Sequence, residues 1–175
     1  MPLVDAEVDG KWWSSMKHNC DLFFRPAHRR DADRISNLIL TLGQSFLFPE
    51  FTSEGQRTFQ KSHSRSAIRR LIDSDISYDL AFCMGQLVGL IGMRDVSHIH
   101  HLFVCESHQG SGVASKLWSL VSKQHRNEVE YTVNASLNAV PVYEAFGFEV
   151  AMPRQVHRGI VFQPMVLRQG RDAEA

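Results

Sequence analysis

The chain has 175 residues, which is enough for one domain with a hydrophobic core and too few for two of ordinary size. Hydrophobic residues make up 43% and charged residues 22% of the sequence, which excludes a disordered or fibrous protein. The 19 Lys and Arg residues balance the 19 Asp and Glu residues, so no global charge attracts the chain to nucleic acid or to an anionic membrane. We expect neither as a partner.

The cysteines and the apolar segments indicate the cellular compartment in which the protein is expected to lie. Cys20, Cys83 and Cys105 are an odd number at unrelated spacings, which argues against a disulfide framework or a zinc site and for reducing surroundings. The sequence starts without a basic segment followed by an apolar run, and no apolar stretch approaches the roughly 20 residues that cross a bilayer. These features predict a soluble, cytoplasmic protein.

Residues 1–20 have no clear period, and Trp12 and Trp13 are their only apolar anchor. We interpret them as an N-terminal extension that either docks through the tryptophans or contacts a partner. The domain is expected to begin at Asp21. Its first elements are predicted as a strand over 22–24 that Pro26 stops, a helix from Asp31 to Gly43, an aromatic loop over 46–51 and one helix over 52–73.

The pattern then changes from helical to alternating. A two-residue turn at Gly85-Gln86 joins the first two predicted strands, and a second short turn lies near Asp95. The predicted strands cover residues 78–84, 87–93, 99–104, 131–133, 148–150 and 160–167, with helices over 113–121 and 139–146 between them. With no repeat and no linker, the reading is one mixed α/β domain over 21–169 and a tail over 170–175.

A glycine-rich loop carries the strongest sign of a ligand. A strand ends at Val104, and after a short polar loop Gly110 and Gly112 open a helix. Such a turn gathers backbone N–H groups at the positive end of the helix dipole, and the glycines let a ligand come close. The loop is therefore predicted to bind a phosphate or pyrophosphate without needing a lysine.

Two other phosphate-binding motifs fit this loop less well. Compared with a dinucleotide-binding fingerprint, this loop lacks the third glycine, because Ser115 stands there. The acidic residue of the fingerprint would be Glu130, which would start the next strand instead of ending it. The P-loop pattern fails because Lys116 lacks the required spacing. The remaining alternative is a glycine-rich helix start that binds nothing.

Several segments together resemble one enzyme family. Residues 109–114, Gln-Gly-Ser-Gly-Val-Ala, match the Q/R-x-x-G-x-G/A signature of the GNAT acetyltransferases, and they follow a strand ending Leu-Phe-Val as in that family. The resemblance runs from about Leu22 to Leu167, and the order and spacing of its parts make it specific. The other matching segments are 24–27 with 31–32, 87–89, 134–136, 139–148 and 159–165.

The resemblance implies a mixed, mostly antiparallel sheet that splays between its fourth and fifth strands, with helices on both faces. Acetyl-CoA would lie in the splay as co-substrate. Its pantetheine arm would bond the backbone of Leu102, Phe103 and Val104. Its pyrophosphate would bond the amides of Gln109, Gly110, Ser111, Gly112, Val113 and Ala114. The family often has Pro where this chain has Glu106, and an inward Glu106 would weaken cofactor binding.

Acyl transfer to an amine needs a neutral amine, a stabilised carbonyl oxygen and a protonated leaving thiolate. Tyr143 matches the family's tyrosine and is the expected proton donor; the alternative is an aromatic packed beside Ala139 and Phe146. Alternation puts His98 and His100 on one face of their strand and His101 on the other. We expect His100 as general base, with His98 as a weaker candidate. These imidazoles could also be plain polar residues, and a metal pair at His98 and His100 lacks a third ligand.

Near the fifth strand, Asn134 and Ser136 are expected to bond the cofactor. Asn138 is as well explained by a helix cap as by a ligand contact, because Pro141 must lie in the first turn of its helix. No G-x-S-x-G elbow is present, so direct transfer in a ternary complex is the expected mechanism.

The predicted function is N-acetylation of a primary amine, carried by a small molecule or a protein, and the sequence does not choose among acceptors. Phe46, Phe48, Phe51 and Phe59 suggest an apolar acceptor wall or ordinary core packing. A homodimer is compatible with a domain of this type. One alternative is a GNAT fold that binds acyl-CoA and regulates a partner without turnover. Another is a nucleotide-binding enzyme that uses the same glycine loop.

Overall fold

A computed structural model describes residues 21–74 and 76–169; the predicted N-terminal extension with its two tryptophans and the predicted tail lie outside the described residues. Its α-helices are α2 (Ala32–Leu42), α3 (Ser53–Ser62), α4 (Arg65–Ile72), α5 (Val113–Gln124) and α6 (Val140–Ala145). Its strands are β1 (Leu22–Pro26), β2 (Ile76–Cys83), β3 (Gln86–Arg94), β4 (His98–Val104), β5 (Glu130–Ala135), β6 (Glu149–Val150), β7 (Gln155–His157) and β8 (Ile160–Arg168).

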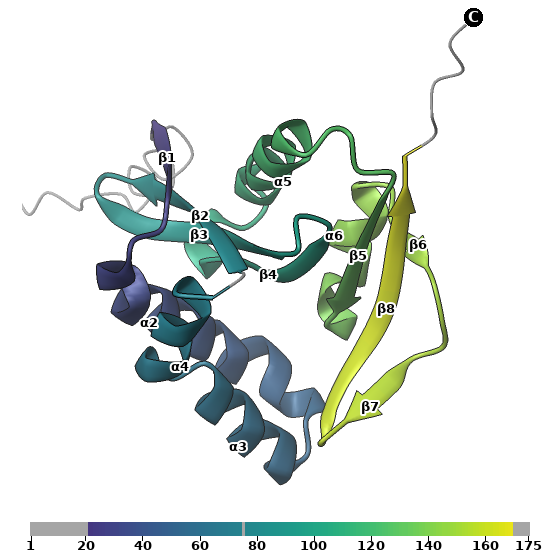
Figure 1. Cartoon of the computed structure of the whole chain (residues 1–175). Coiled ribbons are helices and arrows are strands. Elements are labelled where there is room, and N and C mark those ends of the chain that lie inside the picture. Colours follow the sequence, from purple (N-terminus) through teal and green to yellow (C-terminus); the bar gives the residue numbers. More distant parts are fainter. Residues whose placement is uncertain (1–20, 75, 170–175) are drawn as a thin grey trace, which may run out of the picture.

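The strands form one mixed sheet in the order β1-β2-β3-β4-β5-β8-β6, and β7 also pairs with β8. Every pairing is antiparallel except that of β4 with β5, which is parallel and joins only His98 to Thr132 and Ile99 to Val133. Beyond Ile99 the two strands separate, and Figure 1 shows them diverging beside α6. The predicted splay between the fourth and fifth strands is confirmed.

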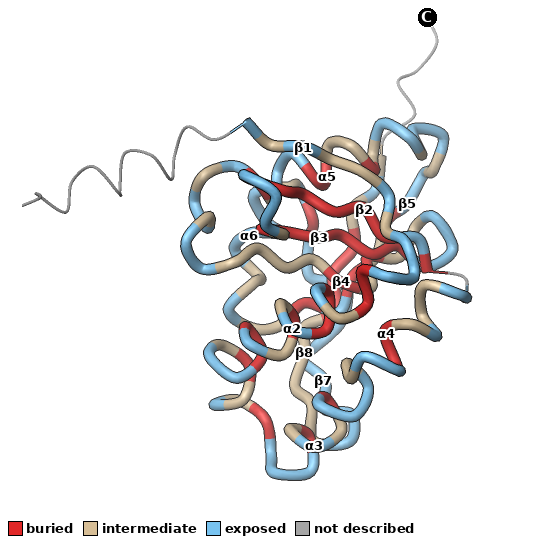
Figure 2. Tube along the Cα trace, turned by 90° about the vertical axis from the view of Figure 1, so that its left-hand side faces the viewer, coloured by how far each residue is buried: buried red, intermediate tan, exposed pale blue. Residues whose placement is uncertain are grey.

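Helices cover both faces of the sheet, and a hydrophobic core lies under each group. On one face Val113, Leu117 and Val121 of α5 pack with Tyr143 of α6. On the other face the apolar side chains of α2, α3 and α4 pack against Tyr78 and other residues of β2 and β3. In Figure 2 the buried segments follow β2, β3 and β4, because these central strands are covered on both sides. The central strands therefore hold the splay in place.

The predicted helix over 52–73 is wrong as a single element. Thr52 caps α3 by accepting a hydrogen bond from the Gly55 amide at 3.2 Å, and Ser64 caps α4 by accepting one from the Ala67 amide at 3.4 Å. The carbonyl of His63 between them accepts a hydrogen bond from the Ser36 hydroxyl at 2.7 Å. A helix start signal inside an apolar period breaks the helix here, and the bond from α2 holds the junction.

Gly43 does not end α2 in the left-handed conformation that a terminal glycine often adopts. It has φ −59°, and the chain continues as the π-helical turn η2 (Gly43–Leu47). A Cβ on Gly43 would come within 2.5 Å of the Phe59 ring, so close packing explains the glycine. Of the four phenylalanines suggested as a wall, Phe48, Phe51 and Phe59 pack against one another with tilted or edge-on rings, whose centroids lie 5.9 to 6.5 Å apart.

Several smaller boundaries differ from the prediction. Cys83 pairs with Gln86, so the two turn residues of the first hairpin are Met84 (φ 49°) and Gly85 (φ 78°). The β1 strand includes Pro26, which an edge strand tolerates. The β7 strand was not predicted, because its three residues are all exposed and give no period.

The cysteine spacing predicted no disulfide framework, and the structure differs at one cysteine. Cys83 is disulfide-bonded, whereas Cys105 is a free, partly buried thiol. Among the described helices, none has the length and apolar character that a membrane span requires. Within the described ranges, no three His, Cys, Asp or Glu side chains gather as a metal site would require.

Candidate active site

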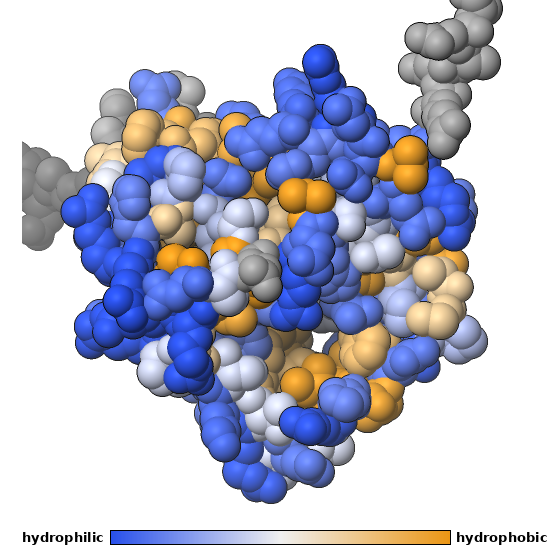
Figure 3. All heavy atoms as spheres, in the orientation of Figure 1, coloured by the Kyte–Doolittle hydropathy of each residue, from blue (hydrophilic) through white to orange (hydrophobic). Residues whose placement is uncertain are grey.

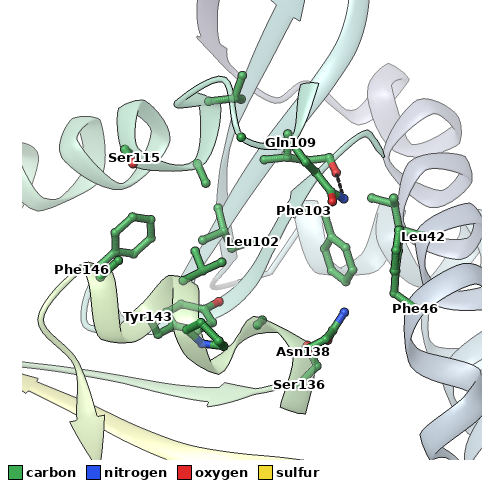
Figure 4. Close-up of a pocket in the computed structure, with 18 of the residues that line it drawn as sticks. Leu42, Phe46, Leu102, Phe103, Gln109, Ser115, Ser136, Asn138, Tyr143 and Phe146 are labelled. Atoms are coloured by element: carbon green, nitrogen blue, oxygen red, sulfur yellow. Dashed lines mark hydrogen bonds between the residues drawn. The ribbon is translucent and has the colours of Figure 1, made fainter. Parts of the chain in front are cut away.

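The splay between β4 and β5 opens into a pocket of about 800 Å³. Figure 4 shows Leu102 and Phe103 of β4 between two walls, with Tyr143 and Phe146 on one side and the α2 end on the other. The lining residues include no Asp, Glu, Lys or Arg. The pocket is lined by Leu42, Phe46, Leu47, Leu102, Phe103, Val104, His108, Gln109, Gly110, Gly112, Val113, Ala114, Ser115, Ser136, Asn138, Ala139, Pro141, Val142, Tyr143, Ala145 and Phe146.

The glycine loop forms one end of the pocket. Gly110 has φ +74° and Gly112 has φ +83°, and nothing lies within 4 Å of a Cβ built on either. Gly112 is the N-cap of α5, a helix of 12 residues, so unpaired amides of the first turn point out of the helix beside the pocket. Glu106 is exposed and does not line the pocket. The loop is thus an open cradle of backbone donors that fits a phosphate group.

One backbone edge of β4 faces the pocket. Leu102, Phe103 and Val104 pair with β3 on one side, opposite Ile91, Leu90 and Gly89 respectively. On the other side their pairing with β5 has already ended at Ile99. The Gln109 side chain bends back and donates a hydrogen bond to the Val104 carbonyl at 3.1 Å. An extended amide-containing ligand can hydrogen bond to such an edge as an added strand would.

Tyr143 projects from α6 into the pocket wall and is only 5% exposed. Its ring packs edge-on against Phe146 and Phe148, with centroids 6.2 and 5.6 Å away. Its hydroxyl has no hydrogen-bond partner among the described residues. Burial raises the pKa of Tyr143 well above its usual value of 10, so the phenol stays protonated. A protonated donor with no protein partner suits a ligand atom in the pocket.

The histidines of β4 do not alternate as predicted. Gly92 pairs with His101 and Met93 pairs with Ile99, which leaves His100 as the extra residue of a β-bulge. The rings of His100 and His101 lie 4.3 Å apart, and Ile99 and Leu102 pack in the same core. The bulge therefore puts His100 and His101 on the same face, where alternation had separated them.

His100 is the first residue of β4 beyond the last pair with β5, so it lies at the start of the splay, although it does not line the pocket. Burial, helped by Arg94 and the nearby His63 and His98, lowers the pKa of His100 to about 4. His98, the weaker candidate, bonds through Nδ1 to the Thr132 hydroxyl at 2.8 Å. With that low pKa His100 is neutral at physiological pH, and unlike His98 its side chain makes no hydrogen bond with the described residues.

Nine of the eleven expected cofactor residues line the pocket, and Ser111 and Asn134 do not. The Ser111 hydroxyl donates to the His108 carbonyl at 2.6 Å, and Asn134 is exposed on β5 opposite Pro164. The Ser136 hydroxyl donates to Oδ1 of Asn138 at 2.7 Å, so Asn138 belongs to the same wall.

Sequence reasoning missed Leu42, Leu47 and His108 as lining residues, and of the suggested aromatic wall only Phe46 reaches the pocket. The position of Phe46 in the aromatic loop was a partial indication that it lines the pocket. Leu42 and Leu47 gave none, because an apolar residue at a helix end looks the same whether it packs in a core or lines a pocket.

The model of the acetyltransferase (GNAT) domain family matches residues 47–169 of this sequence. The chain belongs to the GNAT acetyltransferase family. None of the curated proteins matches this sequence.

Solved GNAT structures share the fold at low sequence identity. A GCN5-related N-acetyltransferase from Rhodopseudomonas palustris is 19% identical with TM-score 0.74, covering 86% of this chain and 98% of its own. The PaiA N-acetyltransferase from Thermoplasma acidophilum, in complex with coenzyme A, is 13% identical with TM-score 0.68, covering 85% and 99%. An aminoglycoside 6'-N-acetyltransferase complexed with coenzyme A is 13% identical with TM-score 0.60, covering 83% and 96%.

Proposed function

We propose that this GNAT protein transfers an acetyl group from acetyl-CoA to a primary amine in a ternary complex. One observation carries the proposal: the open edge of β4 and the glycine cradle at the start of α5 meet in a single pocket. An amide-rich arm ending in a pyrophosphate has the chemistry that these two features bind. The two CoA-bound GNAT relatives support the same ligand class.

In this proposal the pantetheine amides bond the β4 backbone at Leu102, Phe103 and Val104. The pyrophosphate bonds the amides of residues 109–114. Ser136 contributes a hydroxyl from the opposite wall. Asn134 is exposed outside the pocket, so it would need to turn inward to join.

Tyr143 acts as the general acid. Attack of a neutral amine on the thioester carbonyl forms the C–N bond, and the C–S bond breaks as CoA leaves. The Tyr143 hydroxyl donates its proton to the leaving sulfur. Because burial raises the pKa of Tyr143, the phenol holds that proton throughout the physiological range.

His100 acts as the general base at the start of the splay. Its pKa of about 4 means that the imidazole is neutral and can accept a proton at pH 7. The same low pKa makes it a weak base, so the proton taken from the attacking amine passes on to solvent instead of staying on His100. Its role is to accept transiently during C–N bond formation.

The acceptor approaches from the side of the splay away from the glycine loop. Figure 3 shows a hollow in this face, between the helices α2 and α3 and the strands β7 and β8, with apolar residues along part of its rim. The hollow lets an amine reach the start of the splay while the cofactor occupies the pocket.

Calorimetric and thermal-shift titrations with acetyl-CoA, CoA, NAD and ATP test the cofactor assignment. We expect binding and stabilisation with the two CoA species only, and loss of both in Gly112→Trp, whose side chain would fill the cradle. Binding of NAD or ATP in preference to CoA would overturn the proposal.

Turnover is tested by thiol release from acetyl-CoA in the presence of a panel of primary amines. We expect amine-dependent release that Tyr143→Phe diminishes. Tight CoA binding without release for any small amine or lysine peptide would instead identify an acyl-CoA-binding regulatory module.

A further inference from the structure

A chain of hydrogen bonds joins two buried side chains and a half-buried one, from different elements, next to the site. Nε2 of His101 in β4 lies 2.9 Å from Nε2 of His63 at the end of α3. Nδ1 of His101 lies 2.8 Å from the hydroxyl of Tyr78 in β2. Nδ1 of His63 lies 2.8 Å from the carbonyl of Phe59. Neither the cofactor pocket nor the proposed acid and base use these contacts.

The partners indicate a direction for every bond in the chain. The Phe59 carbonyl can only accept, so we assign the proton of His63 to Nδ1, which leaves a lone pair on Nε2. The Ser62 hydroxyl, 3.1 Å from the same Nδ1, then donates to the Phe59 carbonyl at 3.0 Å. His101 must then donate from Nε2, which leaves its Nδ1 to accept from the Tyr78 hydroxyl. Hydrogen bonds therefore run one way, from Tyr78 through His101 and His63 to Phe59. Both imidazoles are neutral, each in one tautomer.

His101 consequently has no nitrogen left for its neighbour His100. The two rings are in contact at a tilt of 41° with centroids 4.3 Å apart, and the His100 side chain makes no hydrogen bond with the described part of the chain. His101 is 7% exposed, whereas His100 is partly exposed. This tilted contact packs the His100 ring against His101, and neither ring nitrogen of His100 is bonded to the described residues.

The surroundings of the chain keep it uncharged. The groups that face His101 are His63 at the end of α3, His100 on its own strand, Arg94 on β3 and Tyr78 on β2. None of these is a carboxylate that would favour an imidazolium. Burial lowers the pKa values of both His101 and His63, and the nearby His63, His100 and Arg94 lower that of His101 further.

We propose that Tyr78, His101 and His63 are positioning residues that act through His100, holding its ring against His101 at the start of the splay, where an unbonded ring nitrogen can take a proton from the acceptor. This inference rests on the proposed role of His100 as base. The contact between His100 and His101 depends on the bulge, because the bulge brings the two rings to the same face of β4.

Nuclear magnetic resonance of the full chain with ¹⁵N-labelled histidines tests the proposal. In the wild-type protein we expect His63 as the Nδ1–H tautomer and His101 as the Nε2–H tautomer. In Tyr78→Phe, His101 should keep the Nε2–H tautomer that His63 imposes, the ¹⁵N shift of its Nδ1 should change because the donor is lost, and the titration midpoint of His100 should move upward as its ring becomes more solvated. Tyr131→Phe is the matched control, since it removes a buried hydroxyl that donates to the His125 carbonyl at 2.6 Å, outside the pocket.

A second pair of variants keeps the test decisive if Tyr78→Phe fails to fold. His63→Gln retains an oxygen that accepts from His101 and should preserve the wild-type midpoint of His100, whereas His63→Leu should shift it. The opposite tautomers in the wild type, or a His100 midpoint that is the same in all variants, would overturn the inference. Calorimetry with CoA on the same samples reports on the proposed function separately, because the spectra need no cofactor.

Discussion

Gly55 of α3 and Gly159 of the β7–β8 turn lie so close that neither can carry a side chain without displacing the other. A Cβ on Gly55 would collide with the Gly159 carbonyl, and a Cβ on Gly159 would collide with Thr52. The Thr52 amide donates a hydrogen bond to that same carbonyl at 3.1 Å. This contact joins the helical side of the splay to the β8 side, at the bottom of the molecule in Figure 1.

Gly55→Ala should separate these two sides. Overpacking against backbone costs about 1–3 kcal/mol, so urea unfolding should show a loss of that size. The glycine cradle lies at another end of the fold, so the Kd of acetyl-CoA should change by less than about twofold. Ser53→Ala is the control: it also places an alanine on α3, but at an exposed position with nothing to overpack. Equal losses in both variants would contradict the packing argument.

Much of the fold could be predicted because its determinants are local. The hairpins that join β2, β3 and β4, the glycine loop and the helix α5 follow from period and from turn residues close in sequence, whereas the splay between β4 and β5 was implied by the family resemblance. The position of His101 could not be predicted, because the bulge at His100 depends on how β4 registers with β3. Strict alternation assumes a regular ladder, and one extra residue reverses every assignment after it.

The site was predictable to a similar degree. Backbone donors at a helix start are encoded by Gly110 and Gly112 themselves, so the cradle could be found from the sequence. The wall made by Leu42 and Leu47 comes from tertiary packing of the α2 end against β4, which no nearby residue encodes. The partnership of His63 with His101 spans 38 residues and two elements, and it depends on a helix break that was also missed.

Tyr143→Phe should lower kcat for amine acetylation by about 100-fold, the lower end of the usual contribution of a general acid. The Kd of acetyl-CoA should not change, because the ring keeps its packing against Phe146 and Phe148. Tyr131→Phe should leave kcat unaltered. Steady-state kinetics combined with calorimetry measures both quantities. An unchanged kcat in Tyr143→Phe would contradict the role of Tyr143 as general acid and mean that its ring serves packing alone.

Asp31→Asn should destabilise the domain by about 2 kcal/mol, the scale of hydrogen bonds to a charged group. The Asp31 carboxylate is 2% exposed and accepts bonds from Arg25 at 2.8 and 2.9 Å. These bonds lower its pKa from 3.8 to about 2, so the stabilisation is present above about pH 4 and is lost as the pH falls toward 2. Acid titration of unfolding should show this loss in the wild type and not in the variant. Asp33→Asn, which breaks a more exposed pair with Arg65, should cost less than about 0.5 kcal/mol.

His101 should make the stability of the folded chain fall in mild acid. Its folded pKa lies well below 6.5 because the side chain is buried, while in the unfolded chain it titrates near 6.5. Below about pH 6.5 the unfolded chain therefore binds a proton that the folded chain does not. Each such histidine removes about 1.4 kcal/mol of stability per pH unit until the folded pKa is reached. Above about pH 6.5 His101 adds no pH dependence to the free energy of unfolding.

Urea unfolding at pH values between about 8 and 5 checks this, with His101→Gln as the variant that cannot titrate. The difference between wild type and His101→Gln should shrink by about 1.4 kcal/mol for each pH unit below about 6.5. His157→Gln, a change on the exposed strand β7, should follow the wild-type curve. Parallel curves for wild type and His101→Gln would mean that His101 takes up a proton in the folded state, contrary to the one-way chain from Tyr78 to Phe59.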